Sequence, residues 1–305
     1  MSIDVVVVTW RGREVLRSCL EHLRRSTVAH RVIVVDNASG DGTLEMLATD
    51  FPEADVVALG ENVGFGRGVN AGVRHGDGDA IVLVNNDVDV EPSFVERIVA
   101  PLADPAVGMV AGLTTIPGSD LVDQFGIQLD RGLCTYNRLR HHPVGDDPGL
   151  LAIPCGGAAA YRRIAFEQAG GFDERLFAYG EDVDLGLRIR LRGWAVAAAP
   201  DARGVHLGGA SAGVDSPFQR RLAGVARGFL LRRYGMLRRV GWWRALAVDL
   251  LVVGWGLARH RTLVPLRSRV EGWRIAGRGS LPLPAGVVDD RVGVVESLRR
   301  LVSAR

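Results

Sequence analysis

Short apolar runs alternate with longer amphipathic stretches along the first 115 residues. The apolar runs are rich in Val and bounded by turn-forming residues, and they lie at 3–8, 32–35, 55–59 and 80–84. Runs of this kind are typical of strands buried on both faces of a parallel sheet. The stretches between them have helical spacing, at 12–25, 41–49 and 66–75. This alternation predicts an α/β domain with a mostly parallel, doubly wound sheet flanked by helices.

The pattern changes further along the chain. Residues 116–150 are richer in Gly, Pro, Asp and His, which predicts a loop-rich excursion over the sheet. Helices are predicted near 163–169 and 181–192, and the remaining C-terminal part reads as mostly helical. We therefore expect a sheet domain over 1–215 followed by a helical C-terminal extension over 216–305.

The charge of the chain is unevenly distributed. The net charge is +2, and all 37 basic residues are arginine. Between Phe218 and Arg278, fourteen arginines against two acidic residues give a local charge of +12. The most apolar stretch of this extension, 245–258, falls short of the roughly 20 residues needed to cross a bilayer.

Two interpretations of the basic extension remain open at this point. The arginines can be the solvated face of a helical cap. Alternatively, an Arg-rich amphipathic surface suits peripheral contact with an anionic membrane, and its tryptophans favour that interpretation. These are Trp242, Trp243, Trp255 and Trp273. Nucleic acid is not expected as a partner, because no recognition motif accompanies the charge.

The cysteines and the N-terminus indicate a cytoplasmic protein. Cys19, Cys134 and Cys155 lie far apart and form no CxxC pair, which favours a reducing compartment. The first ten residues lead directly into a predicted strand without the basic and apolar regions of a signal peptide. We therefore expect a cytoplasmic location, with any membrane contact at the inner face.

Polar residues follow the predicted strands, at the edge where sheets of this kind bind ligands. Asp36 ends the second strand, where its carboxylate can accept the imide N–H of uracil or thymine. The residues after it also suit an ordinary turn and helix N-cap. After the third strand, the glycine-rich run 62–72 allows close approach of a nucleotide to a helix N-terminus.

The fourth strand ends in Asn85-Asn86-Asp87-Val88-Asp89. Carboxylates where an apolar strand emerges are costly unless they are solvated, paired or bound to metal. Their oxygens suit Mg²⁺ or Mn²⁺, which share their ligand shell with substrate phosphates. The alternative is an Asx-rich loop before the next helix.

A second acidic cluster begins the predicted helix at 181. Glu181, Asp182 and Asp184 complement the helix dipole there. The dipole does not explain the aromatic residues in front of them, which could form a wall around a carboxylate. Further along, His206 follows an apolar strand and could complete a metal site.

Six motifs carry a family resemblance over about residues 3–211. In order, they are VVVTW, VVDNASGDGT, ENVGFGRGVNAG, LVNNDVDV, GGFDERLFAYGEDVDLGLRIRLRGW and HLGGAS. The series resembles the family 2 inverting glycosyltransferases of the GT-A fold, especially their bacterial rhamnosyltransferase-like branch. The resemblance implies a Rossmann-like GT-A domain and metal-dependent transfer of a sugar from a nucleoside diphosphate to a hydroxyl of a cell-envelope glycan or lipid-linked acceptor. It favours dTDP-L-rhamnose as donor, although dTDP and UDP sugars share the base pocket.

The resemblance also implies roles for individual residues. Asp182 matches the general base. The nucleotide-binding residues would be Thr9, Asp36, Asn62, Gly64, Arg67, Asn86 and Asp87. The ligands of Mg²⁺ or Mn²⁺ would be Asp87, Asp89 and His206. The residues beside the donor and acceptor would be Gly156, Gly157, Glu181 and Trp194. Asn86 departs from the family pattern, because a strict Asp-x-Asp signature has a carboxylate there.

Two other classes of function use similar features. A sugar-1-phosphate nucleotidyltransferase also places a metal-binding aspartate on an α/β sheet, but it needs a Gly-rich basic loop after the first strand. Thr9-Trp10-Arg11-Gly12-Arg13 is a thin version of that loop. A non-catalytic sugar-nucleotide-binding protein would not need Asp87, Asp182 and His206 together.

Overall fold

The computed structural model describes residues 1–146, 149–208, 216–239, 242–293, 296–297 and 299–300. Within them, a nine-stranded sheet has the order β3-β2-β1-β4-β10-β6-β11-β5, with β7 beside β6. Its strands are β1 (Ile3–Thr9), β2 (Arg31–Asp36), β3 (Asp55–Ala58), β4 (Ala80–Val84), β5 (Val88–Val90), β6 (Val107–Thr115), β7 (Val122–Gln124), β10 (Ala158–Arg162) and β11 (Ala195–His206).

The first four strands confirm the predicted parallel arrangement. β1 pairs in parallel with β2 and β4, and β2 pairs in parallel with β3. β10 then runs antiparallel between β4 and β6, and β5 and β7 run antiparallel to β11 and β6. The sheet is therefore mixed, with parallel pairing at β1 to β4 and again between β6 and β11.

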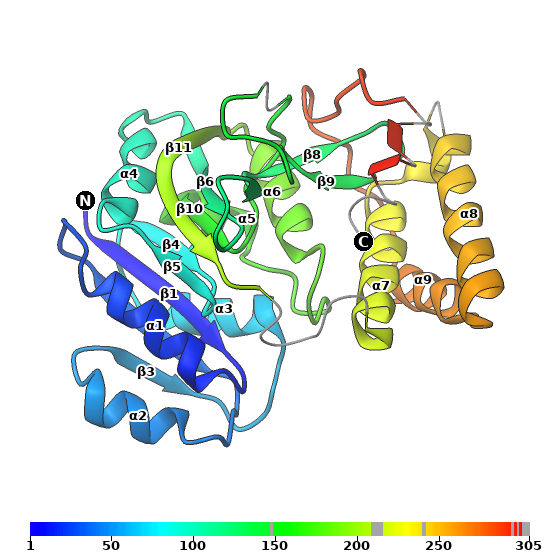
Figure 1. Cartoon of the computed structure of the whole chain (residues 1–305). Helices are drawn as coiled ribbons and strands as arrows, with labels where there is room; N and C mark the ends of the chain where they lie inside the picture. Colours follow the sequence, from blue (N-terminus) through cyan, green and yellow to red (C-terminus); the bar gives the residue numbers. More distant parts are fainter. Residues whose placement is uncertain (147–148, 209–215, 240–241, 294–295, 298, 301–305) are drawn as a thin grey trace.

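Helices cover the two faces of the sheet, as the alternation of elements predicts (Figure 1). Side chains of α1 (Arg13–Leu23), α2 (Thr43–Asp50) and α4 (Phe94–Val99) join one hydrophobic core. Side chains of α3 (Phe65–His75), α5 (Arg163–Ala169) and α6 (Glu181–Leu191) join the other. Within β1, Val5 and Val7 belong to the first core and Val6 to the second, because successive strand residues point to opposite faces.

The segment 116–150 is loop-rich, as predicted, and carries little regular structure. Besides β7, it contains a small antiparallel hairpin of β8 (Ile127–Leu129) and β9 (Thr135–Asn137). β7 pairs with the last residues of β6, which lie beside the end of β11. The turn at His141 and His142, after β9, bonds to Val122 of β7 and so lies at the same end of the sheet.

The C-terminal extension is helical, as predicted, and packs on the sheet domain. Its α-helices in the described residues are α7 (Pro217–Arg233), α8 (Trp242–His260) and α9 (Val264–Ile275), which stand together to one side of the sheet (Figure 1). Phe229 of α7 is fully buried in the same core as α6. The Tyr234 hydroxyl donates a 2.9 Å hydrogen bond to Asp184 Oδ1. Residue 215, the expected end of the sheet domain, lies outside the described residues.

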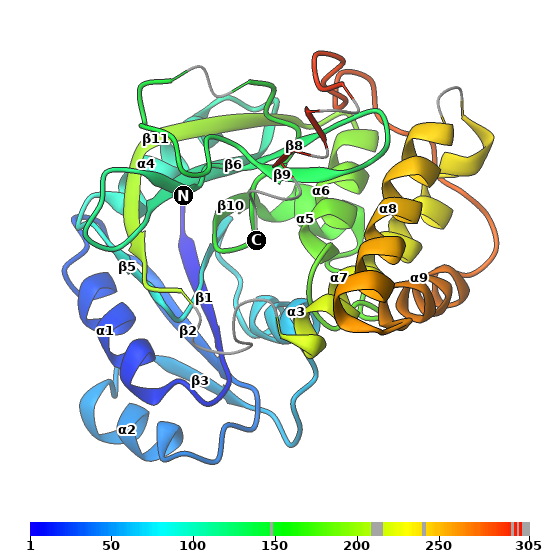
Figure 2. The ribbon, with the colours of Figure 1, turned by 45° about the vertical axis from the view of Figure 1, so that its right-hand side comes forward.

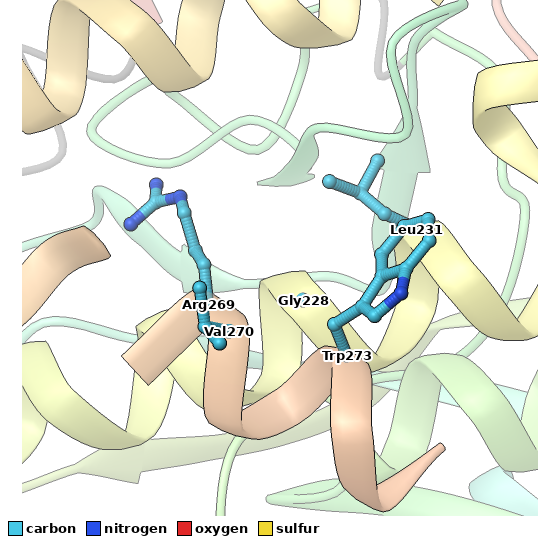
Figure 3. Close-up of a pocket in the computed structure, with 5 residues that line it drawn as sticks. All are labelled: Gly228, Leu231, Arg269, Val270 and Trp273. Atoms are coloured by element: carbon cyan, nitrogen blue, oxygen red, sulfur yellow. The ribbon is translucent and has the colours of Figure 1, made fainter. Parts of the chain in front are cut away.

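Helices α7 and α9 cross at unusually short range. A Cβ at Gly228 would overlap the backbone of Arg269, so the close approach needs glycine there. A small, mainly apolar pocket of about 190 Å³ lies at this crossing, with Leu231 and Trp273 side by side (Figure 3). Arg269 supplies its one charged group and is held by Asp249 at 2.8 Å. The pocket therefore offers little to a sugar nucleotide. No helix in the described part of the chain has the length and apolar character needed to cross a membrane.

Candidate active site

The first two parallel strands bring Thr9 and Asp36 to neighbouring positions. The two residues are partners in the β1–β2 register, and both are buried. The Thr9 hydroxyl accepts a 3.0 Å hydrogen bond from Asn86 Nδ2, which ties the end of β1 to the turn after β4. The Asp36 carboxylate accepts from the backbone N–H of Ser39 at 3.3 Å. Three of the predicted nucleotide residues thus lie at one edge of the sheet.

Asn37 connects this edge to the loop before α3. Its side chain donates to the carbonyl of Gly64 at 3.1 Å and accepts from the N–H of Val63 at 2.9 Å. Asn62 Oδ1 accepts from the N–H of Gly64 at 3.0 Å. Gly64 has a φ of +87° and sits against the backbone of Phe177, where a Cβ would overlap the carbonyl oxygen. Glycine is therefore required for this loop geometry.

A carboxylate–imidazole–carboxylate chain lies at the end of β11. His206 Nε2 is 3.2 Å from Asp87 Oδ1, and its Nδ1 is 2.6 Å from Asp123 Oδ2. The pairing of His206 with Val88 and the bond from Leu207 N–H to the Asp87 carbonyl hold the two segments together. The predicted association of Asp87 with His206 is present in the structure.

The two carboxylates change the chemistry of the imidazole. Burial alone lowers the pKa of His206, but the hydrogen bonds and charges of Asp123 and Asp87 outweigh it and raise the pKa to about 9. In turn, although burial opposes it, the contact with His206 keeps the pKa of Asp123 below its usual value. The two neighbouring carboxylates thus favour the protonated form of His206.

Asp89 does not join this group. Its Oδ2 accepts a 2.9 Å hydrogen bond from Ser18 of α1, and its Oδ1 lies 3.5 Å from His22 Nδ1. A turn between Asn85 and Val88 separates Asp87 from the short strand that carries Asp89. Asp89 therefore points toward α1, away from His206.

Two consecutive glycines, Gly156 and Gly157, connect the second acidic cluster to the same end of the sheet by hydrogen bonds. Asp182 Oδ2 accepts from the N–H of Gly156 at 3.3 Å, and its Oδ1 accepts from its neighbour Val183 at 2.7 Å. The carbonyl of Gly157 accepts from the N–H of Asn85, two residues before Asp87. A Cβ at Gly157 would lie 2.7 Å from Gln124 Oε1, and Gln124 is next to Asp123. The structure thus brings Asp182 to the edge that carries Asp87 and His206.

The carboxyls of Glu181 and Asp182 both have raised pKa values. Burial is the main cause for Glu181, and the charge of Asp182 adds to it, so its pKa rises to about 8. Glu181 Oε2 has no hydrogen-bond partner in the described structure. Burial also raises the pKa of Asp182, against the opposing effect of the bonds from Gly156 and Val183. Asp182 is only partly enclosed, so it can meet a substrate, whereas Glu181 is buried.

Glu181 should make stability depend on pH. Between its ordinary pKa of 4.5 and its folded value of about 8, the native state keeps a proton that the unfolded chain has lost. The free energy of unfolding therefore falls as pH rises across this window. Glu181→Gln removes this pH-dependent loss of stability. The melting temperature of the variant, relative to that of wild type, should therefore rise between pH 5 and pH 9. The control is Glu91→Gln, at an exposed carboxylate, and an equal pH trend in both variants would contradict the assignment.

Two predicted site residues have other partners. Arg67, in the first turn of α3, lies 3.3 Å from Glu174 and is half exposed. Trp194 donates from Nε1 to Gln168 at 2.9 Å. It precedes β11, whose opposite end carries His206. The structure therefore does not bring Trp194 to the acidic groups.

Asn37 and Asp123 contact the predicted site residues but were not among them. Asn37 lies in the turn directly after Asp36, where its amide reads as an ordinary turn signal. Asp123 lies in the loop-rich segment, which has no periodicity to indicate a direction for its side chain. The pairing of β7 with β6 is what carries Asp123 to His206.

Comparison with known proteins identifies the class. Residues 4–170, more than half of the chain, match the family model of glycosyl transferase family 2. The chain belongs to this family and is a glycosyltransferase, as the ordered motifs predict. The nucleotidyltransferase and the non-catalytic binding protein are therefore set aside.

The curated relatives include members of the predicted branch. The chain is 29% identical over 276 residues to the N-acetylglucosaminyl-diphospho-decaprenol L-rhamnosyltransferase of Mycobacterium tuberculosis (strain ATCC 25618 / H37Rv). The aligned region covers 80% of this chain and 87% of that protein. It is 27% identical over 216 residues to an N-acetylglucosaminyltransferase of Rhizobium sp. (strain N33), covering 66% of this chain and 47% of that one. The rhamnosyltransferase-like resemblance is confirmed.

Solved structures confirm the GT-A fold. The mannosyltransferase PcManGT from Pyrobaculum calidifontis, in complex with GDP-Man and Mn²⁺, aligns with a TM-score of 0.54 at 18% identity, over 91% of this chain and 76% of that one. GalNAc-T7 with UDP, GalNAc and Mn²⁺ aligns with a TM-score of 0.61 at 15% identity, over 81% of this chain and 51% of that one. At these identities the likeness concerns the fold.

The residues at the end of β11 suit a divalent cation with an open shell. A carboxylate oxygen of Asp87 and the Nε2 of His206 already lie 3.2 Å apart, and such oxygen and nitrogen donors are accepted by Mn²⁺ and Mg²⁺. Among the described residues, no three His, Cys, Asp or Glu side chains converge on one point to enclose a metal. A cation here would therefore share its shell with water and with phosphates.

Proposed function

We propose that the protein transfers L-rhamnose from dTDP-L-rhamnose, with inversion, to a hydroxyl of a lipid-linked, N-acetylglucosamine-containing diphosphate acceptor. The proposal is supported by the bond from Gly156 to Asp182 and the bond from Asn85 to Gly157, which link Asp182 to the turn that carries Asp87, and by the contact of Asp87 with His206. The likeness to the mycobacterial enzyme, which extends over most of both chains, supports the choice of donor and acceptor.

The donor's nucleotide would bind across the ends of β1, β2 and β4. Within the described residues, the Asp36 carboxylate accepts from one donor, the backbone N–H of Ser39, so its remaining lone pairs can accept the imide N–H of thymine. Asn62 and Gly64 shape the loop that faces this strand edge, and Asn86 is oriented by Thr9. Glycine at position 64 lets this loop pack against the backbone of Phe177, which fixes the loop beside the proposed nucleotide site.

Asp87 and His206 would hold Mg²⁺ or Mn²⁺ against the donor's diphosphate. When bound, the cation supplies positive charge to the diphosphate as it leaves. Asp123 is the positioning residue, since its bond to Nδ1 turns Nε2 of His206 toward Asp87. Binding a metal requires neutral imidazole, so His206 would release the proton that the two carboxylates favour in its absence.

Asp182 would act as the general base. A carboxylate with a raised pKa is a stronger base than a solvated aspartate, and Gly156 fixes its direction by a hydrogen bond. The acceptor oxygen forms its bond to the anomeric carbon while the bond from that carbon to the diphosphate breaks. The hydroxyl proton passes to Asp182. A single displacement of this kind inverts the configuration of the sugar.

A cavity next to the site offers room for the acceptor. It has a volume of about 920 Å³ and lies between β9, the turns after it and the C-terminal residues Asp289, Arg299 and Arg300. Arg140 lines it and also lies 3.5 Å from Asp123, so the cavity adjoins the His206 group. Arginines near the reacting end suit the phosphates of a diphosphate-linked acceptor.

Thermal melting with free nucleotides tests the choice of donor. A ligand that binds only the native state raises the melting temperature by mass action. With Mn²⁺ present, dTDP should raise it more than GDP, and UDP should come close to dTDP because the two share the imide N–H. Asp36→Asn should reduce the rise with dTDP, since an amide cannot offer two acceptor oxygens. A larger rise with GDP than with dTDP would contradict the thymidine assignment.

A further inference from the structure

Helix α8 presents an apolar face to solvent along its whole length. Seven large side chains on it are between 40% and 62% exposed: Trp242, Trp243, Leu246, Leu250, Leu251, Trp255 and Leu257. At 100° per residue they share a broad side of the helix, to which Gly254 and Ala258 also belong. An apolar surface of this extent on a water-exposed helix marks an interaction site.

The opposite side of α8 packs against the rest of the chain and fixes the orientation of the helix about its axis. Ala245, Val248, Asp249 and Gly256 are buried against the rest of the chain. Asp249 makes ion pairs with Arg227 of α7 at 3.2 Å and with Arg269 of α9 at 2.8 Å. The helix is therefore anchored by one side and cannot rotate its apolar face inward. Figure 1 shows α8 at the outer edge of the helical extension, and Figure 2, in which this side is turned forward, shows α8 in front of it.

The charges around this face select its partner. Arg238 precedes α8, and Arg259 and Arg261 follow its apolar stretch, all of them exposed. The two acidic residues between 218 and 278 are already paired, Asp249 as above and Glu271 with Arg221 at 2.7 Å. The face is thus apolar in the middle and positive at both ends, which is the pattern of helices that lie in the headgroup region of anionic bilayers.

We propose that α8 docks the protein on an anionic membrane surface, with its apolar face among the lipid headgroups and the upper acyl chains. A second copy of the chain is a poorer occupant, because a two-fold contact through this face would bring the same arginines together. The inference stands apart from the proposed reaction, since docking needs neither donor nor acceptor. It does suit an acceptor carried by lipid, because Val248 and Val252 of α8 pack against Tyr136 and Val292, which line the 920 Å³ cavity.

Vesicle flotation tests the docking. The full chain should bind vesicles of phosphatidylcholine mixed with phosphatidylglycerol, bind pure phosphatidylcholine weakly, and lose binding as NaCl is raised. Leu250→Glu/Trp255→Glu should weaken binding to the mixed vesicles at least about tenfold, because two apolar anchors are replaced by charges that the anionic surface repels. The tryptophan emission of wild type should shift to the blue when vesicles are added.

Val56→Glu/Ile164→Glu is the matched control, since it makes the same change in charge at exposed apolar residues of β3 and α5. It should bind like wild type, and all variants should melt alike because the replaced side chains are exposed. Failure of wild type to bind mixed vesicles, or equal binding by both double variants, would overturn the proposal. So would a lipid-free dimer in analytical ultracentrifugation that only the α8 variant dissociates, because the face would then join two copies. Turnover of a soluble acceptor should be unchanged in the α8 variant.

Discussion

Asp182→Asn is expected to lower kcat at least about 100-fold while leaving donor binding intact, because general-base catalysis contributes roughly 10²–10⁴-fold. The amide keeps the size of the side chain and can still accept the hydrogen bond from Gly156, but it cannot take the acceptor's proton. The measurement is release of nucleoside diphosphate under saturating donor, together with the thermal shift given by the donor nucleotide.

Asp201→Asn is the control for this result, since Asp201 is exposed in β11 and should give wild-type rates. Because the pKa of Asp182 is raised, the wild-type rate should increase with pH through a value above the ordinary pKa of 3.8, as the base loses its proton. Near-normal turnover by Asp182→Asn would remove this residue from the chemical step.

Asp87→Asn is expected to have the second-largest effect. It removes one of the two donors beside the proposed cation and leaves His206 paired with Asp123 alone. Losing several kcal/mol of charge stabilisation corresponds to a fall in kcat of about 100-fold or more. Independently of turnover, the additional rise in melting temperature that Mn²⁺ gives in the presence of dTDP should disappear. Chelation of wild type with EDTA should have the same effect.

Asp89→Asn distinguishes this account from a general effect of acidic residues after β4. Asp89 is held by Ser18 of α1 and faces away from His206, so its variant should keep the Mn²⁺ response. If Asp89→Asn abolished the Mn²⁺ response and Asp87→Asn did not, Asp89 rather than Asp87 would be the carboxylate that binds the cation.

The sheet could be predicted from sequence because its strands are buried on both faces. Val5 to Val7, Ile33 to Val35 and Ile81 to Leu83 are at most 1% exposed, so every position in them had to be apolar. The antiparallel β10 was not predicted. Its direction is set by pairing with β4 and β6, which are far from it in the chain.

The positions of the candidate site residues were predictable where the motifs lie at strand or helix termini that the topology brings to one end of the sheet. Asp36, Asp87 and Asp182 are of this kind. Trp194 shares a continuous motif with Asp182, but a helix of 11 residues, about 16 Å long, separates them. Asp123 could not be found because its position depends on the pairing of β7 rather than on any local periodicity.

The most direct test of the account is a single reaction with dTDP-L-rhamnose and an N-acetylglucosaminyl diphospholipid, followed by NMR of the sugar product. We expect dTDP to be released in step with the product, and the new linkage to have the anomeric configuration opposite to that of the donor. A product that retains the donor's configuration would contradict the single displacement assisted by Asp182, and release of pyrophosphate in place of dTDP would contradict glycosyl transfer itself.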